Sequence, residues 1–290
     1  MSVFKGIWVP LVTPFRRGEI DFQALRALVE KLLAEEVQGL VVCGTTGEAA
    51  ALSAEEQLHV LDAVLQWAPP ARVVMGLAGN HLPGLLAFLQ AIQQRPLAGL
   101  LVPAPYYIRP SQAALEGFFD SVASAARVPV ILYDIPARTG ARIDRETLLR
   151  IVRHPNIAAV KDCAGDLGTT LALIASGQVD VLAGEDLQIF NTLCLGGSGA
   201  ISASAHIGAP LFNQLYRQTL AGELAAARRT FYRLLPWIEV AFREPNPAVV
   251  KAALSVQGVI GHELRLPMLG CSEATLGGLP ALLAGLREAL

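Results

Sequence analysis

Lysine is scarce in this sequence of 290 residues, and arginine carries most of the positive charge. The only lysines are Lys5, Lys31, Lys161 and Lys251, out of 23 lysine and arginine residues in all. Because 25 acidic residues bring the formal net charge to −2, the composition gives no general attraction to nucleic acid or to anionic membranes. We therefore expect no nucleic-acid partner.

Long apolar runs are also missing. Nowhere do about 18 apolar residues follow one another without a charge or a glycine or proline, so we expect no membrane span. The opening stretch MSVFKGIWVPLVTPF has no long apolar segment behind a basic start, and we expect no secretory signal. None of the four cysteines (Cys43, Cys163, Cys194 and Cys271) forms a CxxC pair or a metal-ligand spacing with histidine. We expect them to be small buried side chains of a cytoplasmic protein.

Short apolar segments alternate with longer amphipathic ones along most of the chain. The short ones predict eight strands, at residues 6–14, 39–44, 72–79, 99–105, 129–136, 157–162, 179–184 and 199–204. Their nearly continuous apolar character is typical of strands that are buried on both faces of a parallel sheet. Three of the helices predicted between them begin with N-cap residues, Asp21, Ser53 and Ser111.

This alternation predicts an α/β fold, a (β/α)8 TIM barrel with a C-terminal helical extension. An open doubly wound sheet is the alternative, and the lack of a GxGxxG motif after the first strand weakens it. Beyond the eighth strand only helical patterns follow, at residues 209–222, 223–242, 246–258 and 272–290. We therefore divide the chain into a (β/α)8 barrel that carries the site, residues 1–222, and a C-terminal helical subdomain, residues 223–290.

The catalytic and binding side chains of such barrels lie at the C-terminal ends of the strands. Here these ends carry GTTGE, PAPYYIRPS, YDIPARTG, KDCAGD and AGED, and the eighth strand carries GGSGAIS. They hold no histidine and no group of three metal-ligand types. We expect no metal site and a reaction that does not depend on an imidazole.

Lys161 ends the sixth predicted strand and has two interpretations. It could form an ion pair with a carboxylate such as Asp162 or Asp166. It could instead be a nucleophile, because burial in the barrel would lower the pKa of its amine and the neutral amine could form a Schiff base with a keto group. Arginine could not take this second role, since it keeps its proton.

Other strand ends also allow two interpretations. Tyr133 could be a core aromatic, or its phenol could relay protons beside an imine-forming lysine. Thr45 and Thr46 could belong to a glycine-rich turn with a helix cap, or they could hold an anionic carboxylate together with backbone N–H groups. Arg138 could form a surface ion pair or clamp a second carboxylate with its planar guanidinium.

In their order and spacing, these motifs resemble the pyruvate-dependent class I lyase family that contains dihydrodipicolinate synthase and N-acetylneuraminate lyase. The resemblance runs over nearly the whole chain, through VPLVTPF, GTTGE, PYYIRPSQ, LYDIPARTG, VKDCAGD, GGSGAIS, EPNP and LRLPM. It implies that Lys161 forms an imine with pyruvate, so that no separate cofactor is needed. It also implies that Gly184 and Ile201 line the pyruvate site.

The resemblance implies roles for four hydroxyl-bearing residues. Thr46 and its turn would hold the carboxylate of pyruvate. Thr45, Tyr133 and Tyr107 would form a hydroxyl relay, with Tyr107 reaching in from an adjacent subunit. A homotetramer built as a dimer of dimers is implied in the same way.

Arg138 bears on the second substrate, because PARTG resembles the synthase subgroup, in which an arginine would bind the carboxylate of L-aspartate 4-semialdehyde. The implied reaction joins pyruvate to this aldehyde and gives 4-hydroxy-tetrahydrodipicolinate for lysine and diaminopimelate biosynthesis. One alternative is a related aldolase or dehydratase that acts on another 2-keto acid or sugar acid. A different class of alternative is a barrel that binds a keto acid without turnover.

The sequence departs from the family pattern in two places. Cys163 and Ala164 follow Lys161-Asp162 where an ATG-like run is usual. The polar and acidic cleft that binds regulatory lysine is matched by Ala49, Ala54, Gln57 and Gly84, with Asn80 and Tyr106 retained. We therefore expect feedback by lysine to be weak or absent.

Overall fold

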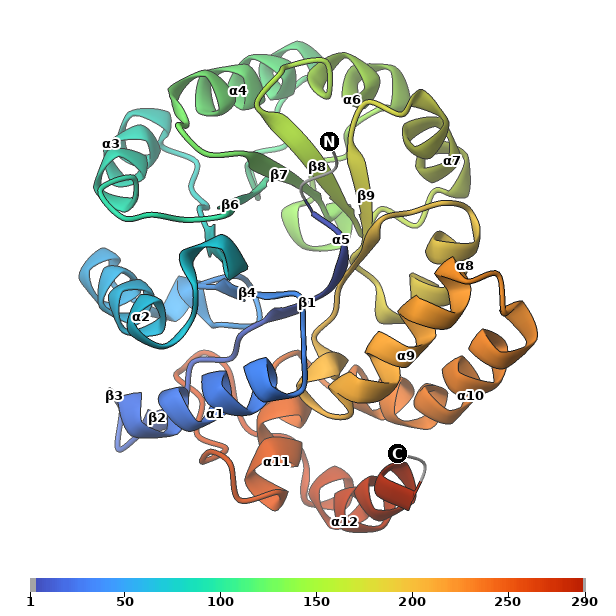
Figure 1. Ribbon diagram of the computed structural model, residues 1–290. Coiled ribbons are helices and arrows are strands. Elements are labelled where there is room, and N and C mark those ends of the chain that lie inside the picture. Colours follow the sequence, from blue (N-terminus) through green and yellow to red (C-terminus); the bar gives the residue numbers. More distant parts are fainter. Residues whose placement is uncertain (1–3, 289–290) are drawn as a thin grey trace.

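In the computed structural model, eight parallel strands close into a barrel that helices surround (Figure 1). The structure describes residues 4–288. Residues 1–3 and 289–290 lie outside the described residues. The first of these ranges begins the expected barrel segment and the opening stretch in which we expect no secretory signal. The second ends the expected helical subdomain. The closed barrel confirms the predicted fold and excludes the open doubly wound sheet.

The barrel strands follow the chain in order around the ring, and the last of them pairs with the first. They are β1 (Gly6–Pro10), β4 (Gly39–Val42), β5 (Val73–Gly76), β6 (Gly99–Pro103), β7 (Val130–Asp134), β8 (Ile157–Asp162), β9 (Asp180–Ala183) and β10 (Gly199–Ile201). Nearly every residue in them is buried, as expected for strands covered on both faces. A short antiparallel ribbon, β2 (Phe15–Arg16) and β3 (Glu19–Ile20), follows β1 outside the barrel.

Helices cover the outside of the barrel and account for the amphipathic segments of the sequence. Those that follow the first seven barrel strands are α1 (Phe22–Ala34), α2 (Ala54–Trp67), α3 (Leu82–Ile92), α4 (Gln112–Ala125), α5 (Pro136–Thr139), α6 (Arg145–Ile151), α7 (Leu167–Ser176) and α8 (Ile189–Cys194). The three predicted N-caps are confirmed. Asp21, Ser53 and Ser111 each accept a hydrogen bond from a backbone N–H of the first helical turn, and Ser53 and Glu56 form a capping box.

After β10 the chain continues as α9 (Ala209–Leu220), α10 (Leu224–Ala241), α11 (Ala248–Val256) and α12 (Glu273–Glu288). These helices lie together on one side of the barrel (Figure 1), where α9 contacts β1 and α10, and α10 contacts α12. The boundary that we placed at residue 222 falls between α9 and α10. Buried side chains of α10 and α11, such as Leu234 and Val249, belong to the same core cluster as the layer between barrel and helices.

A second cluster of buried side chains fills the interior of the barrel. Its members are Phe4, Trp8, Val41, Val74, Leu101, Ile131, Tyr133, Ile135, Ala159, Cys163, Leu182 and Ile201. Alternation along each strand therefore sends Tyr133 and Cys163 inward, and their strand neighbours outward toward the helices. The interior is packed, and a cavity opens at the end where the strands finish.

The cysteines are free in the structure, and their burial differs. Cys43 and Cys163 are buried, as expected, but Cys194 is exposed and Cys271 is intermediate. The expectation is wrong for Cys194 because it ends the short helix α8, whose buried positions are Ile189, Thr192 and Leu193, and Cys271 is only partly buried. None of the helices among the described residues combines the length and apolar character that crossing a bilayer requires.

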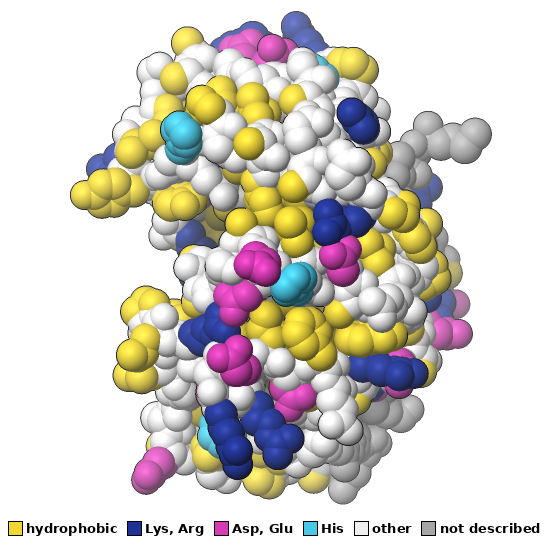
Figure 2. All heavy atoms as spheres, turned by 90° about the vertical axis from the view of Figure 1, so that its left-hand side faces the viewer, with side chains coloured by type: hydrophobic (Ala, Val, Ile, Leu, Met, Phe, Trp, Pro, Cys, Tyr) yellow, Lys and Arg dark blue, Asp and Glu magenta, His cyan; other side chains and the backbone are white. Residues whose placement is uncertain are grey.

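Charged side chains are mixed on the face formed by the left-hand side of Figure 1. Figure 2 shows that acidic and basic side chains there are interspersed with hydrophobic and neutral ones. A surface of this kind carries no single-sign field that would steer a polyanion.

Candidate active site

The register between β7 and β8 brings two predicted site residues together. Tyr133 is the direct partner of Lys161 across the two parallel strands. The Nζ atom of Lys161 lies 4.2 Å from the centre of the Tyr133 ring, and both side chains are buried. The phenol is therefore in position to exchange protons with a group attached to this amine.

The two carboxylates considered as partners of Lys161 are engaged elsewhere. Asp162 accepts hydrogen bonds from the backbone N–H of Ala164 at 3.0 Å and from the hydroxyl of Thr170 at 2.5 Å. Asp166 caps α7 through the backbone N–H of Gly168. The interpretation of Lys161 as the partner of Asp162 or Asp166 is wrong, because Asp162 follows Lys161 on the opposite face of the strand.

The electrostatics of the site also correct one expectation. Burial lowers the pKa of Lys161, but its interactions with the Tyr133 phenol, with Cys163 and with the buried carboxylate of Asp186 outweigh burial and raise it. The lowered pKa predicted from desolvation alone is therefore wrong. Burial raises the pKa of Tyr133, so its phenol keeps a proton at neutral pH. Lys161 consequently has to give up a proton before it attacks a carbonyl.

Gly184 follows β9 and touches the lysine. A Cβ atom at this position would lie 2.2 Å from the Sγ atom of Cys163 and 2.9 Å from the Cγ atom of Lys161. Glycine is thus required for the lysine and the cysteine to occupy their places. Ile201 ends β10 inside the barrel and is 1% exposed, in the same interior cluster as Tyr133.

A tight turn after β4 carries the two predicted threonines. Thr46 is buried, and its hydroxyl accepts a hydrogen bond of 2.9 Å from the amide of Asn246, which lies just before α11. Thr45 is exposed and lines the cavity together with Tyr133, and its hydroxyl and the Lys161 amine both act to lower the pKa of the Tyr133 phenol. Thr45 therefore lies between solvent and the buried pair formed by Tyr133 and Lys161.

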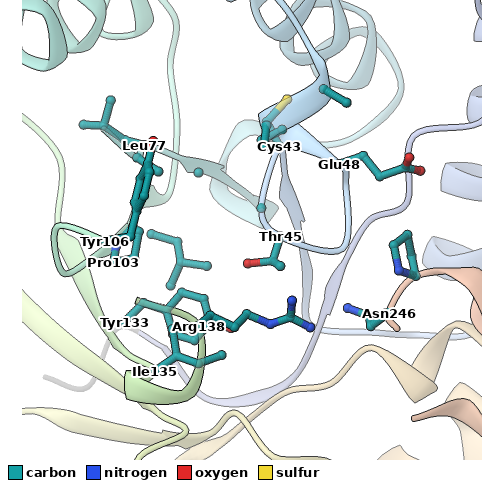
Figure 3. Close-up of a pocket in the computed structure, with 18 of the residues that line it drawn as sticks. Cys43, Thr45, Glu48, Leu77, Pro103, Tyr106, Tyr133, Ile135, Arg138 and Asn246 are labelled. Carbon is teal, nitrogen blue, oxygen red and sulfur yellow. The ribbon is translucent and has the colours of Figure 1, made fainter. Parts of the chain in front are cut away.

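A cavity of about 530 Å³ opens at this end of the barrel. Thr45, Tyr133, Arg138 and Asn246 are among its lining residues, and Figure 3 shows the Arg138 guanidinium extending toward the space between Thr45 and Asn246. Lys161 is not part of the lining, and its Nζ atom lies over the ring of Tyr133, which is. The cavity offers hydroxyl groups and a guanidinium, which suit a ligand with carboxylates.

Tyr107 is apart from these residues. Its side chain is 89% exposed, and it does not line the cavity, although its neighbour Tyr106 does. Its backbone has a φ of 72°, and its N–H donates to the carbonyl of Thr139 at 2.8 Å. Within one chain the structure does not bring Tyr107 to Lys161.

Sequence reasoning missed the parts that Asn246 and Asp186 play. Asn246 lies in EPNP, 200 residues from its partner Thr46, and the motif alone did not indicate that contact. Asp186 ends AGED, and one of its oxygens accepts from the hydroxyl of Ser202 and from the N–H of Ser204, each at 2.8 Å. The acidic end of the seventh predicted strand, AGED, and the serines of GAISAS in the eighth were the sequence features that could have indicated these hydrogen bonds.

Comparisons with known proteins agree with this geometry. A sequence model of the dihydrodipicolinate synthetase family matches residues 3–284. The chain belongs to this family. A 4-hydroxy-tetrahydrodipicolinate synthase of Syntrophobacter fumaroxidans is 37% identical over 276 residues, which are 94% of this chain and 95% of the relative.

Solved structures give the same answer for the fold. The dihydrodipicolinate synthase of Aquifex aeolicus superposes with a TM-score of 0.94 at 30% identity, covering 98% of each chain. A monomeric dihydrodipicolinate synthase variant superposes with a TM-score of 0.95 at 29% identity, covering 98% of this chain and 97% of the other. The family match thus extends over nearly the whole chain, residues 3–284, and the solved structures share its fold.

Proposed function

We propose that this protein condenses pyruvate with L-aspartate 4-semialdehyde to give 4-hydroxy-tetrahydrodipicolinate, through an imine on Lys161. The observation that carries the proposal is the placement of the buried Lys161 amine beside the Tyr133 phenol, at the end of a barrel whose cavity presents Arg138. Membership of the dihydrodipicolinate synthetase family and relatives named 4-hydroxy-tetrahydrodipicolinate synthase support it.

The first half of the reaction activates pyruvate. The Lys161 amine loses its proton and attacks the keto carbon, and water leaves as the imine forms. Tyr133 and Thr45 pass protons to and from the oxygen that departs. Thr46 and its turn hold the carboxylate of pyruvate, while Gly184 and Ile201 bound the site from the neighbouring strands.

The second half forms the new carbon–carbon bond. Loss of a proton from the methyl group of the imine gives an enamine, whose carbon adds to the aldehyde. Arg138 binds the carboxylate of that aldehyde substrate. The amine of the substrate then displaces Lys161 and closes the ring. The imine itself withdraws electrons, so this reaction needs no separate cofactor.

Two measurements test the proposal. Treatment with pyruvate and borohydride should add the mass of the reduced adduct to the protein but not to the Lys161→Ala variant. No added mass in the native protein would refute imine chemistry. A coupled assay with aspartate semialdehyde should then give the heterocycle; cleavage of a longer 2-keto acid instead would favour the related aldolase.

We further propose that Tyr107 completes the relay in an adjacent subunit of a homotetramer. The supporting observation is that Tyr107 is 89% exposed and does not line the cavity of its own chain. Mixing dissociated Lys161→Ala and Tyr107→Phe chains should restore about a quarter of the sites, because each mixed pair holds one intact site. Activity that stays at the level of the single variants would contradict a shared site.

A further inference from the structure

A buried ion pair joins the C-terminal helices to the turn that carries Thr45 and Thr46. The Nζ atom of Lys251, on α11, lies 2.5 Å from the Oε1 atom of Glu48. The side chains of this pair are 0% and 2% exposed, and they are 203 residues apart in the sequence. Of the four lysines in the sequence, Lys251 is therefore buried as well as Lys161.

Both charged groups have further partners. Lys251 also donates to the carbonyl of Glu263 at 2.7 Å and lies 4.3 Å from the centre of the Phe15 ring. The second carboxylate oxygen of Glu48 accepts from the backbone N–H of Arg265 at 3.2 Å. Neither charge could lose its partner without leaving the other buried and uncompensated.

Glu48 closes the turn through its own backbone. Its φ of 54° is left-handed, and its N–H donates to the carbonyl of Thr45 at 3.1 Å. The amide of Asn246, just before α11, donates to the hydroxyl of Thr46 at 2.9 Å. Two residues of the C-terminal region, Asn246 and Lys251, thus bind the turn through Thr46 and Glu48. Both contacts are close in sequence to Thr45.

A buried ion pair is seldom the best way to stabilise a fold, because apolar side chains of similar volume serve as well. The ion pair instead fixes the position of the turn, because both oxygens of the Glu48 carboxylate are bound. We propose that Lys251 is a positioning residue, which acts through Glu48 to hold the Thr45 hydroxyl against the Tyr133 phenol. This inference rests on the proposed imine chemistry.

The test measures how fast the pyruvate imine forms, by quenching with borohydride and weighing the protein, with rates expressed per folded molecule. Lys251→Met should slow imine formation roughly 10–100-fold, because a small displacement of a relay group has an effect of this size. Glu48→Gln keeps the shape of the side chain and provides the same test if Lys251→Met folds poorly. Leu254→Ala is the matched control, because it truncates a buried side chain of the same helix. It should reduce stability and leave the rate per folded molecule unchanged.

A double-mutant cycle separates positioning from a purely structural role. Thr45→Val should slow imine formation strongly in the native background and only a few-fold in the Lys251→Met or Glu48→Gln background, since the hydroxyl is already displaced there. Additive effects, or a native rate in the folded variants, would overturn the inference. If the native protein itself forms no adduct, the proposed function fails instead, so the two failures are distinguishable.

Discussion

The absence of a side chain at Gly184 leaves the space that Lys161 and Cys163 occupy. An added Cβ would lie 2.2 Å from the Sγ atom of Cys163 and 2.9 and 3.0 Å from the Cγ and Cε atoms of Lys161. Ordinary carbon contacts lie at about 3.5–4.0 Å, so the sulfur has to move by more than about 1 Å and the lysine by about half as much. Both side chains are buried, and the wall around them is packed. We expect Gly184→Ala to lower the free energy of unfolding by about 1–3 kcal/mol, the usual effect of overpacking.

The two clashes can be separated by a second substitution. Cys163→Ala removes the sulfur, so the Gly184→Ala/Cys163→Ala pair should regain most of the lost stability in urea unfolding. It should not regain imine formation, because the contacts with Lys161 remain. Cys163→Ala alone should keep near-native imine formation with a loss of about 1 kcal/mol for the small cavity. Native stability and a native adduct rate in Gly184→Ala would show that this reasoning about the wall of the site is wrong.

Three further predictions concern pH and regulation. Because the pKa of Lys161 is raised and only the neutral amine attacks, imine formation should speed up from about pH 6 to about pH 9 in stopped-flow measurements; a flat profile would contradict it. Burial, and then the charge of Asp162, raise the pKa of Asp134 from 3.8 to about 7. The protonated form therefore stabilises the fold fully below about pH 4, and this contribution, about 4 kcal/mol at most, is lost as the pH rises through 7. Asp134→Asn should abolish this dependence in urea unfolding and exceed the native stability at pH 8, and equal profiles would refute the assignment. Lysine at millimolar concentration should leave activity nearly unchanged, and tight lysine binding in calorimetry would contradict this.

The lysine result depends on what surrounds the matching positions. Gln57 donates to the carbonyls of Ala49 and Leu52, so its amide is already used. The nearby acid, Glu48, is neutralised by Lys251. Among the described residues lining this part of the cavity, no other carboxylate is present to pair with the ammonium group of a bound lysine.

Features set by local sequence could be predicted. The apolar runs of the strands, the N-caps at Asp21, Ser53 and Ser111, and the place of Lys161 at a strand end all depend on neighbouring residues. Backbone hydrogen bonding repeats every few residues, so such patterns remain readable along a single chain. The closed barrel followed from eight of these units in succession.

Features set by contacts between distant segments needed the tertiary structure. The pKa of Lys161 was predicted in the wrong direction, because the sequence gives burial but not which acidic neighbours face the amine. Asn246 reaches Thr46, and Lys251 reaches Glu48, only because α11 returns to the mouth of the barrel. The sequence by itself determined which chemistry this protein has at its strand ends. The tertiary structure decided which groups hold that chemistry in place, because burial and charge act between atoms that are close in space and far apart along the chain.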